Sequence, residues 1–201
     1  MNDMIAQVEQ QLLQAKGLEL GDIERSLDTL LGREIDYGEV FVQSTRGESF
    51  ALEDGIVKEG SFGVEAGIGL RALAGERTGF AYSEDIRLDG LKQAAKAARS
   101  IAGSGSQRRA PGFKAVDFAP LYAPTDPISS LTDEDKVKLL RQIDQTARAQ
   151  DDKVKEVTVR IAGNHESVLV MASDGTLAAD IRPLVRLDVS VIVEHNGRRE
   201  R

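Results

Sequence analysis

The chain has 201 residues, a length that suits one domain or two small ones. It carries 33 acidic residues against 26 Lys and Arg, a net charge of -7. This balance argues against a nucleic-acid partner, because such binding depends on cationic side chains. The sequence has no cysteine, which excludes disulfides and thiolate metal sites within it. No apolar stretch approaches the roughly 18 residues of a membrane span, and residues 1–16 lack the apolar core of a signal peptide. We therefore expect a cytoplasmic location and no membrane partner.

The first third of the chain predicts two helices followed by strands. Apolar residues recur on one helical face over residues 3–16 and again over 22–32, and each pattern stops at a glycine. Residues 38–83 then show the short alternating runs of an antiparallel meander. Within it, Asp54-Gly55 predicts a tight hairpin, because glycine accepts the positive φ that such a turn needs.

The rest of the chain predicts a second group of helix and strands. A helix over residues 86–102 ends the first group, and residues 103–130 are a linker rich in Gly, Ser, Arg and Pro. Thr132 followed by Asp135 predicts the start of a helix over 133–150. Strands then run to the end of the chain.

We therefore expect one α+β region over residues 1–201, with antiparallel or mixed sheets and helices packed on them. Its parts are a strand meander plus helix over 36–102, the linker over 103–130, and a helix followed by strands over 131–201.

The last residues resemble a hairpin with almost no second strand. Residues 185–193 alternate cleanly, and Asn196-Gly197 is the strongest short hairpin signal. Only four residues follow it. This pattern favours a chain that is the front part of a longer protein, although a frayed natural tail would give the same sequence.

The two histidines do not form a metal or catalytic motif. His165-Glu166 would suit a zinc peptidase only with a second histidine one helical turn away, but Leu169 and Val170 stand there. We expect His165 to be a surface turn residue and His195 to be a solvated hairpin residue.

The glycine pair in Gly67-x-Gly69 resembles part of a dinucleotide fingerprint. That motif would need to open a helix after a parallel strand, whereas these residues run into another turn. We favour the interpretation that small residues let another backbone approach the strand. From the residues alone, no catalytic constellation can be assigned to this chain.

Residues 52–85 and 173–201 resemble the N-terminal region of the TldD/PmbA family, specifically its TldD branch, and the likeness follows the order of the whole chain. The resemblance implies a zinc metalloprotease whose His-Glu-x-x-x-His motif and further Cys ligand belong to a C-terminal domain. None of those residues matches here. We therefore expect no catalytic residue, no metal ligand and no cofactor in this chain, with zinc in the missing domain and the fragment alone inactive.

The resemblance also implies a function in peptide handling. Such subunits pair with a PmbA-like (TldE) paralogue, and their N-terminal domains help to enclose a chamber that admits unfolded peptides. We expect this chain to form part of that chamber and of the subunit contacts, with Gly63, Gly67, Gly69 and Arg71 facing the peptide. The alternative is a stand-alone peptide-binding or assembly module without protease activity. A homodimer through an exposed strand at 185–193 is a further expectation.

Overall fold

The computed structural model describes residues 3–32, 34–102, 110–116 and 121–201. Residues 103–109 and 117–120 of the linker expected at 103–130 lie outside these described residues. The helices are α1 (Asp3–Leu12), η1 (Gln14–Lys16, a short 3-10 helix), α2 (Leu20–Leu30), α3 (Leu88–Ala102) and α4 (Asp133–Arg148). The strands are β1 (Tyr37–Glu53), β2 (Ile56–Ala74), β3 (Arg77–Ser83), β4 (Lys114–Ala115), β5 (Val154–Ala172), β6 (Thr176–His195) and β7 (Arg198–Glu200).

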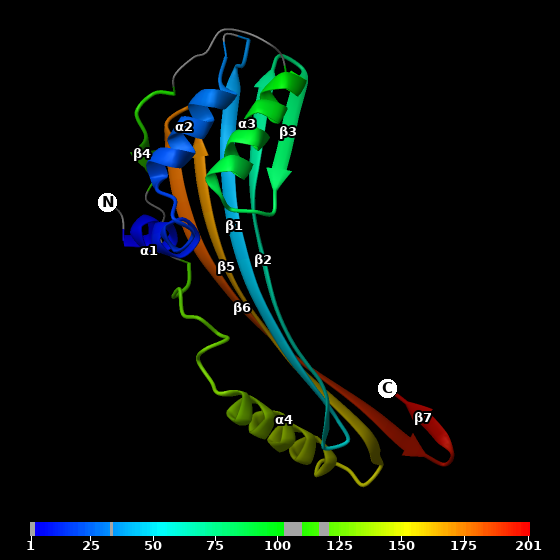
Figure 1. Cartoon of the computed structure of the whole chain (residues 1–201). Helices are drawn as coiled ribbons and strands as arrows, with labels where there is room; N and C mark the ends of the chain where they lie inside the picture. The colour runs from blue at the N-terminus through cyan, green and yellow to red at the C-terminus, as the bar shows by residue number, and fades with distance from the viewer. Residues whose placement is uncertain (1–2, 33, 103–109, 117–120) are drawn as a thin grey trace. The chain divides into compact units, whose positions relative to one another are not determined.

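The strands belong to one mixed sheet. Its order is β3-β2-β1-β5-β6-β4, with β7 paired to β6 (Figure 1). The β2–β3 and β6–β7 pairs are antiparallel, whereas the two residues of β4 pair with β6 in parallel. The predicted α+β class is therefore confirmed, and the meander β1-β2-β3 has the expected order.

The predicted hairpin turns form where the sequence placed them. Asp54 and Gly55 both have positive φ, at 49° and 76°, and so do Asn196 and Gly197, at 50° and 75°. Two consecutive positive φ angles give the turn whose twist matches the strands on either side. Asn tolerates this conformation and Gly adopts it freely, so the local sequence decides these turns.

The strands are much longer than the sequence pattern predicted. The apolar runs at 157–161 and 168–171, which are interrupted by polar residues in the sequence, are parts of a single strand, β5, of 19 residues. The prediction that His165 lies in a surface turn is wrong, because it lies inside β5 and is only 4% exposed. Backbone pairing continues through this stretch although its side chains do not alternate regularly between apolar and polar.

The chain divides into two units, and the long strands contribute to both. The first unit contains Met1–Thr45, Glu65–Ala123 and Glu166–Ile181, and the second contains Arg46–Val64, Pro124–His165 and Arg182–Arg201.

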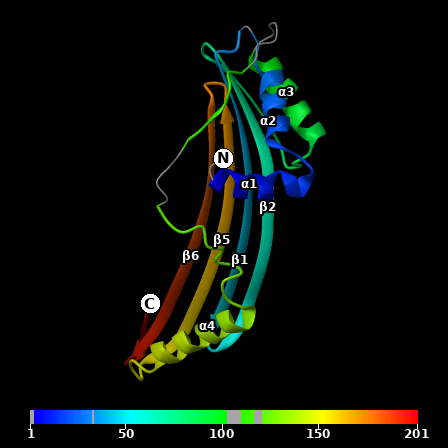
Figure 2. The same ribbon diagram turned by 90° about the vertical axis from the view of Figure 1, so that its left-hand side faces the viewer.

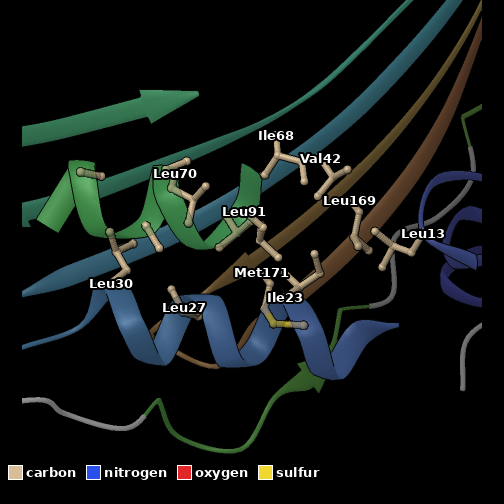
Figure 3. Close-up of a cluster of buried hydrophobic side chains, with 14 of the residues drawn as sticks. Leu13, Ile23, Leu27, Leu30, Val42, Ile68, Leu70, Leu91, Leu169 and Met171 are labelled. Carbon is tan, nitrogen blue, oxygen red and sulfur yellow. The ribbon is translucent and has the colours of Figure 1, made fainter. Parts of the chain in front are cut away.

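In the first unit, α2 and α3 bury an apolar stripe against the sheet. Ile23, Leu27 and Leu30 from α2 meet strand residues such as Leu70 and Leu169, and all are inaccessible to solvent (Figure 3). Full burial of such a side chain contributes about 1.5–3 kcal/mol.

Helix α3 lies unusually close to β3 at Gly79. A Cβ atom on this glycine would come within 2.0 Å of the Ala98 carbonyl oxygen and 2.9 Å of the Ala102 nitrogen. The absence of a side chain at Gly79 is therefore a condition for the packing of α3 on β3.

In the second unit, α4 packs on the sheet through a smaller core. Leu140 meets Leu52, Val157 and Val159, and all four are inaccessible to solvent. Figure 2 shows α4 lying across strands of the sheet. Thr132 caps the helix as predicted, since its side chain accepts a hydrogen bond from the Asp135 N–H. Within the described residues, no helix is long and apolar enough to cross a membrane.

Candidate functional site

Three of the four residues predicted to face a peptide lie on one face of β2 in the first unit. Gly67, Gly69 and Arg71 alternate with Ile68 and with other residues that belong to the buried core. Because neighbouring strand residues point to opposite faces, these three lie on the face opposite the core helices. Gly63 belongs to the second unit, and a Cβ atom there would meet nothing within 4 Å.

The two core-distal glycines make room for β3. A Cβ atom on Gly69 would lie 3.2 Å from the Phe80 ring, and one on Gly67 would lie 3.0 Å from the Ser83 carbonyl oxygen. Phe80 therefore packs its ring over Gly69. This agrees with the expectation that small residues here permit a close approach, and the approaching group is the neighbouring strand.

Two aromatic side chains from β3 form an exposed platform beside these glycines. The register places Tyr82 opposite Gly69 and Phe80 opposite Arg71. The Phe80 and Tyr82 rings stack with centroids 6.4 Å apart, and the residues are 55% and 70% exposed. This platform was not predicted from the sequence, although the alternation of aromatic and small residues over 79–82 is its signal.

Beside this platform, Arg71 forms an ion pair with Glu39. Its Nε lies 2.9 Å from Oε1 of Glu39, and the Tyr37 hydroxyl donates to Oε2 of the same carboxylate at 3.0 Å. Burial raises the pKa of Tyr37 to about 12, with further contributions from the hydrogen bond and the charge of Glu39. Arg71 is thus fixed at the surface by a carboxylate that is itself held in place.

A partly buried polar cluster in the second unit was also not predicted from the sequence. Nη2 of Arg46 lies 2.7 Å from Oδ2 of Asp126 and 3.3 Å from Nδ1 of His165. Burial lowers the pKa of His165, the charge of Arg46 lowers it further, and Asp126 opposes both. A neutral imidazole can accept a hydrogen bond from the guanidinium, whereas an imidazolium cannot.

The carboxylate of Asp126 fixes the segment that precedes α4. Burial alone would raise the pKa of Asp126, but the Ile128 N–H and the Arg46 guanidinium lower it below its usual range. The Ile128 N–H donates to Oδ1 at 2.9 Å. The Asp126 carboxylate therefore links the turn at Ile128 to Arg46 on β1.

The buried ammonium group of Lys136 anchors α4 itself. Nζ of Lys136 lies 2.5 Å from Oε1 of Glu48 and donates to the Ile128 carbonyl at 2.7 Å. It also lies 5.8 Å from the centroid of the Phe50 ring. The Lys136 side chain is only 5% exposed and that of Glu48 is 13% exposed. These contacts are structural ties between the helix and β1.

The described residues contain no group of three or more His, Asp or Glu side chains placed to hold a metal ion. His165 directs Nδ1 to Arg46, and His195 is an exposed residue at the end of β6.

Two family descriptions match the chain. "PmbA/TldA metallopeptidase domain 1" matches residues 38–102, and "PmbA/TldA metallopeptidase central domain" matches residues 126–201. The chain therefore belongs to the PmbA/TldD metallopeptidase family.

Curated relatives narrow the comparison to TldD. A protein described as "Metalloprotease TldD homolog" from Haemophilus influenzae is 46% identical over 200 residues, which are 98% of this chain and 42% of that protein. A protein of the same description from Buchnera aphidicola subsp. Acyrthosiphon pisum is 38% identical over 96% of this chain and 40% of its own length. The chain thus spans about two fifths of these relatives.

Solved structures share the fold at low identity. TldE from Thermococcus kodakarensis superposes with a TM-score of 0.66 at 15% identity, covering 90% of this chain and 40% of that one. A protein described as a putative modulator of DNA gyrase from Bacteroides thetaiotaomicron gives 0.69 at 16% identity, covering 90% and 42%.

Proposed function

We propose that this chain is the metal-free front part of a TldD-type metallopeptidase that degrades or processes unfolded peptides. In this proposal the chain helps to form the chamber that admits peptides and contributes to subunit contacts. The support comes from family membership, from the names of the relatives and from the partial coverage of their length. Bond cleavage then belongs to parts of the complete protein outside residues 1–201, where zinc is the expected metal.

The observation that carries this proposal is the platform of Phe80 and Tyr82 on β3. Among the described residues, β3 pairs with β2 alone, so its other edge offers free backbone N–H and C=O groups. An extended peptide can add to such an edge through its main chain, whatever its sequence. Aromatic rings beside the edge add contact area without demanding a particular side chain.

The partner proposed for the complete protein is a PmbA/TldE-like subunit. The fold shared with TldE supports this choice, because similar folds can assemble through related surfaces. A cytoplasmic location fits a peptidase that acts on unfolded chains. A homodimer is the competing assembly.

Peptide hydrolysis by the full-length, metal-loaded protein with its partner subunit tests the proposal. An unstructured peptide is the substrate, and Phe80→Ala/Tyr82→Ala is the variant. Each aromatic contact contributes about 0.5–1.5 kcal/mol, so loss of both should raise KM about tenfold. We expect kcat to stay within about twofold, because the platform does not touch the reacting bond.

The matched control is Ile101→Ala, which removes an exposed apolar side chain, 57% exposed, from α3 in the same unit. An unchanged KM in the Phe80/Tyr82 variant would contradict the assignment of the platform. A full-length protein that binds peptide but never cleaves it, with metal and partner present, would instead favour the stand-alone binding module.

A further inference from the structure

The hydrogen-bonding pattern of the β2–β3 hairpin decides which backbone groups of β3 lie at its outer edge. Gly75, with a φ of 57°, opens a two-residue turn that pairs Ala74 with Arg77. Such a closing pair is hydrogen-bonded, and hydrogen-bonded and non-hydrogen-bonded pairs alternate along the ladder beyond it. Alternate residues of β3 therefore direct their backbone N–H and C=O groups away from β2. They are Thr78, Phe80 and Tyr82.

The contacts of β2 support this pattern. Leu73 stands opposite Thr78, and its carbonyl oxygen accepts a hydrogen bond from the Asp36 N–H at 2.8 Å. The backbone of Leu73 thus points away from β3, as a non-hydrogen-bonded pair requires. Thr78, its partner in that pair, points its N–H and C=O to the outer edge of β3, which pairs with no other described strand (Figure 1).

The rings of Phe80 and Tyr82 lie beside the backbone groups that an added strand would use. In antiparallel pairing, the peptide residues opposite Phe80 and Tyr82 are two apart and project their side chains to the face of the rings. Two residues of an extended chain span roughly 6.8 Å, and the ring centroids are 6.4 Å apart. Each ring can therefore meet one peptide side chain.

The two ends of β3 carry opposite charges. Arg77 begins the strand, and its side chain is 62% exposed, with Oε2 of Glu34 at 3.9 Å. Glu84 follows the strand, and a Cβ atom on Gly67 would lie 3.7 Å from its Cα. Glu65, exposed like Glu84, lies two residues before Gly67 on β2. A chain antiparallel to β3 therefore starts near the two glutamates and ends near Arg77.

We infer that the β3 edge binds short peptides antiparallel to β3, with the free α-amino group at the two glutamates and the free α-carboxylate at Arg77. The inference rests on the peptide-binding role proposed above and adds a direction and a length. A peptide of about seven residues matches the seven residues of β3, with its first residue opposite Ser83. Its second and fourth side chains then lie beside Tyr82 and Phe80, where apolar residues bury the most surface.

Peptide binding to the full-length protein with its partner subunit, treated with a chelator so that the peptide is not cleaved, tests the inference by calorimetry. The probe is a seven-residue threonine peptide with valines at its second and fourth positions and both ends free. Exposed charge pairs are weak, so amidation of the carboxylate or acetylation of the amine should each raise Kd about threefold. N-methylation of the fourth residue removes a hydrogen bond to β3 and should raise Kd about tenfold, whereas N-methylation of the third should change it less than about twofold.

Two variants identify the ends of the site. In Arg77→Gln, amidation should no longer change Kd, while acetylation still does. In Glu65→Gln/Glu84→Gln the two effects should be exchanged. The matched control is Lys92→Gln, which removes an exposed charge from α3 in the same unit and should leave both effects intact.

The outcomes separate this inference from the proposed function. End effects assigned to the opposite variants would show parallel binding and overturn the inference. Equal effects of N-methylation at the third and fourth positions would also overturn it. If Phe80→Ala/Tyr82→Ala weakens binding but blocking either end does not, the proposed function stands and the inference fails. A Kd that is unchanged in Phe80→Ala/Tyr82→Ala, or no measurable binding, contradicts the proposed function and the inference with it.

Discussion

The ammonium group of Lys136 joins α4 to β1 and to the segment before the helix, and its removal should loosen the helix. In Lys136→Met the apolar stem is kept, but the Glu48 carboxylate loses its partner at a site where it is 13% exposed. Removal of one partner of a buried pair costs about 3–5 kcal/mol, and the partial exposure of Glu48 favours the lower end. The Ile128 carbonyl also loses its donor.

Amide exchange of α4 in the full-length protein measures this effect locally, where a global unfolding curve would mix several domains. A loss of about 3 kcal/mol corresponds to about 100-fold faster exchange over Asp133–Arg148. Lys138→Met is the matched control, because Lys138 is exposed on the same helix and should change exchange by less than about threefold.

A second variant separates the stranded charge from a simple loss of contact. Lys136→Met/Glu48→Gln removes both charges, so exchange should return at least halfway to that of the wild type. Exchange within threefold of the wild type in Lys136→Met would refute the reasoning. A double variant as fast as the single one would show that the unpaired carboxylate is not the cause.

Two further predictions concern other parts of the fold. Burial lowers the pKa of His165 in the folded protein below its usual value of 6.5. As the pH falls, the imidazole is therefore protonated more readily in the unfolded state than in the folded state. The stability that the neutral imidazole contributes is complete above pH 6.5 and is lost as the pH falls through the lowered pKa. When the pH is lowered from 7.5 to 5.0, the midpoint temperature of thermal unfolding should therefore fall more in the wild type than in His165→Gln. An equal fall in both proteins would contradict this prediction. Gly79→Ala should destabilise the first unit by about 2 kcal/mol or more, since its Cβ would overlap the Ala98 carbonyl. Gly63→Ala, with nothing within 4 Å, should change thermal stability by less than about 0.5 kcal/mol, and similar losses in both would refute the packing argument.

Turns and helix ends could be predicted because they depend on neighbouring residues. Asn196-Gly197 closes its turn through the backbone preferences of those two residues, and Thr132 caps α4 through an N–H three residues away. Likewise Gly17 adopts a φ of 73° and ends the first helical region. Each of these signals acts over a few residues, so the sequence carries it directly.

The platform and the polar cluster could not be assembled from the sequence in the same way. Phe80 meets Gly69 because the β2–β3 register brings them together, and no local pattern states that register. Asp126 and His165 lie 80 and 119 positions after Arg46 along the chain. The short spacing test applied to His165 excluded a zinc motif but could not reveal an arginine on another strand.

The sequence by itself determined the α+β class, the hairpins, the helices and, through resemblance, the family. These features follow from the spacing of apolar residues, from the residues at turns and from the composition. The first two depend on neighbouring residues, and the third is a property of the whole chain. Only the tertiary structure decided that the strands are long, that His165 is buried and that Lys136 is paired with Glu48. Strand length depends on continuous backbone pairing, and burial depends on which distant element covers a side chain, so neither is written in neighbouring residues.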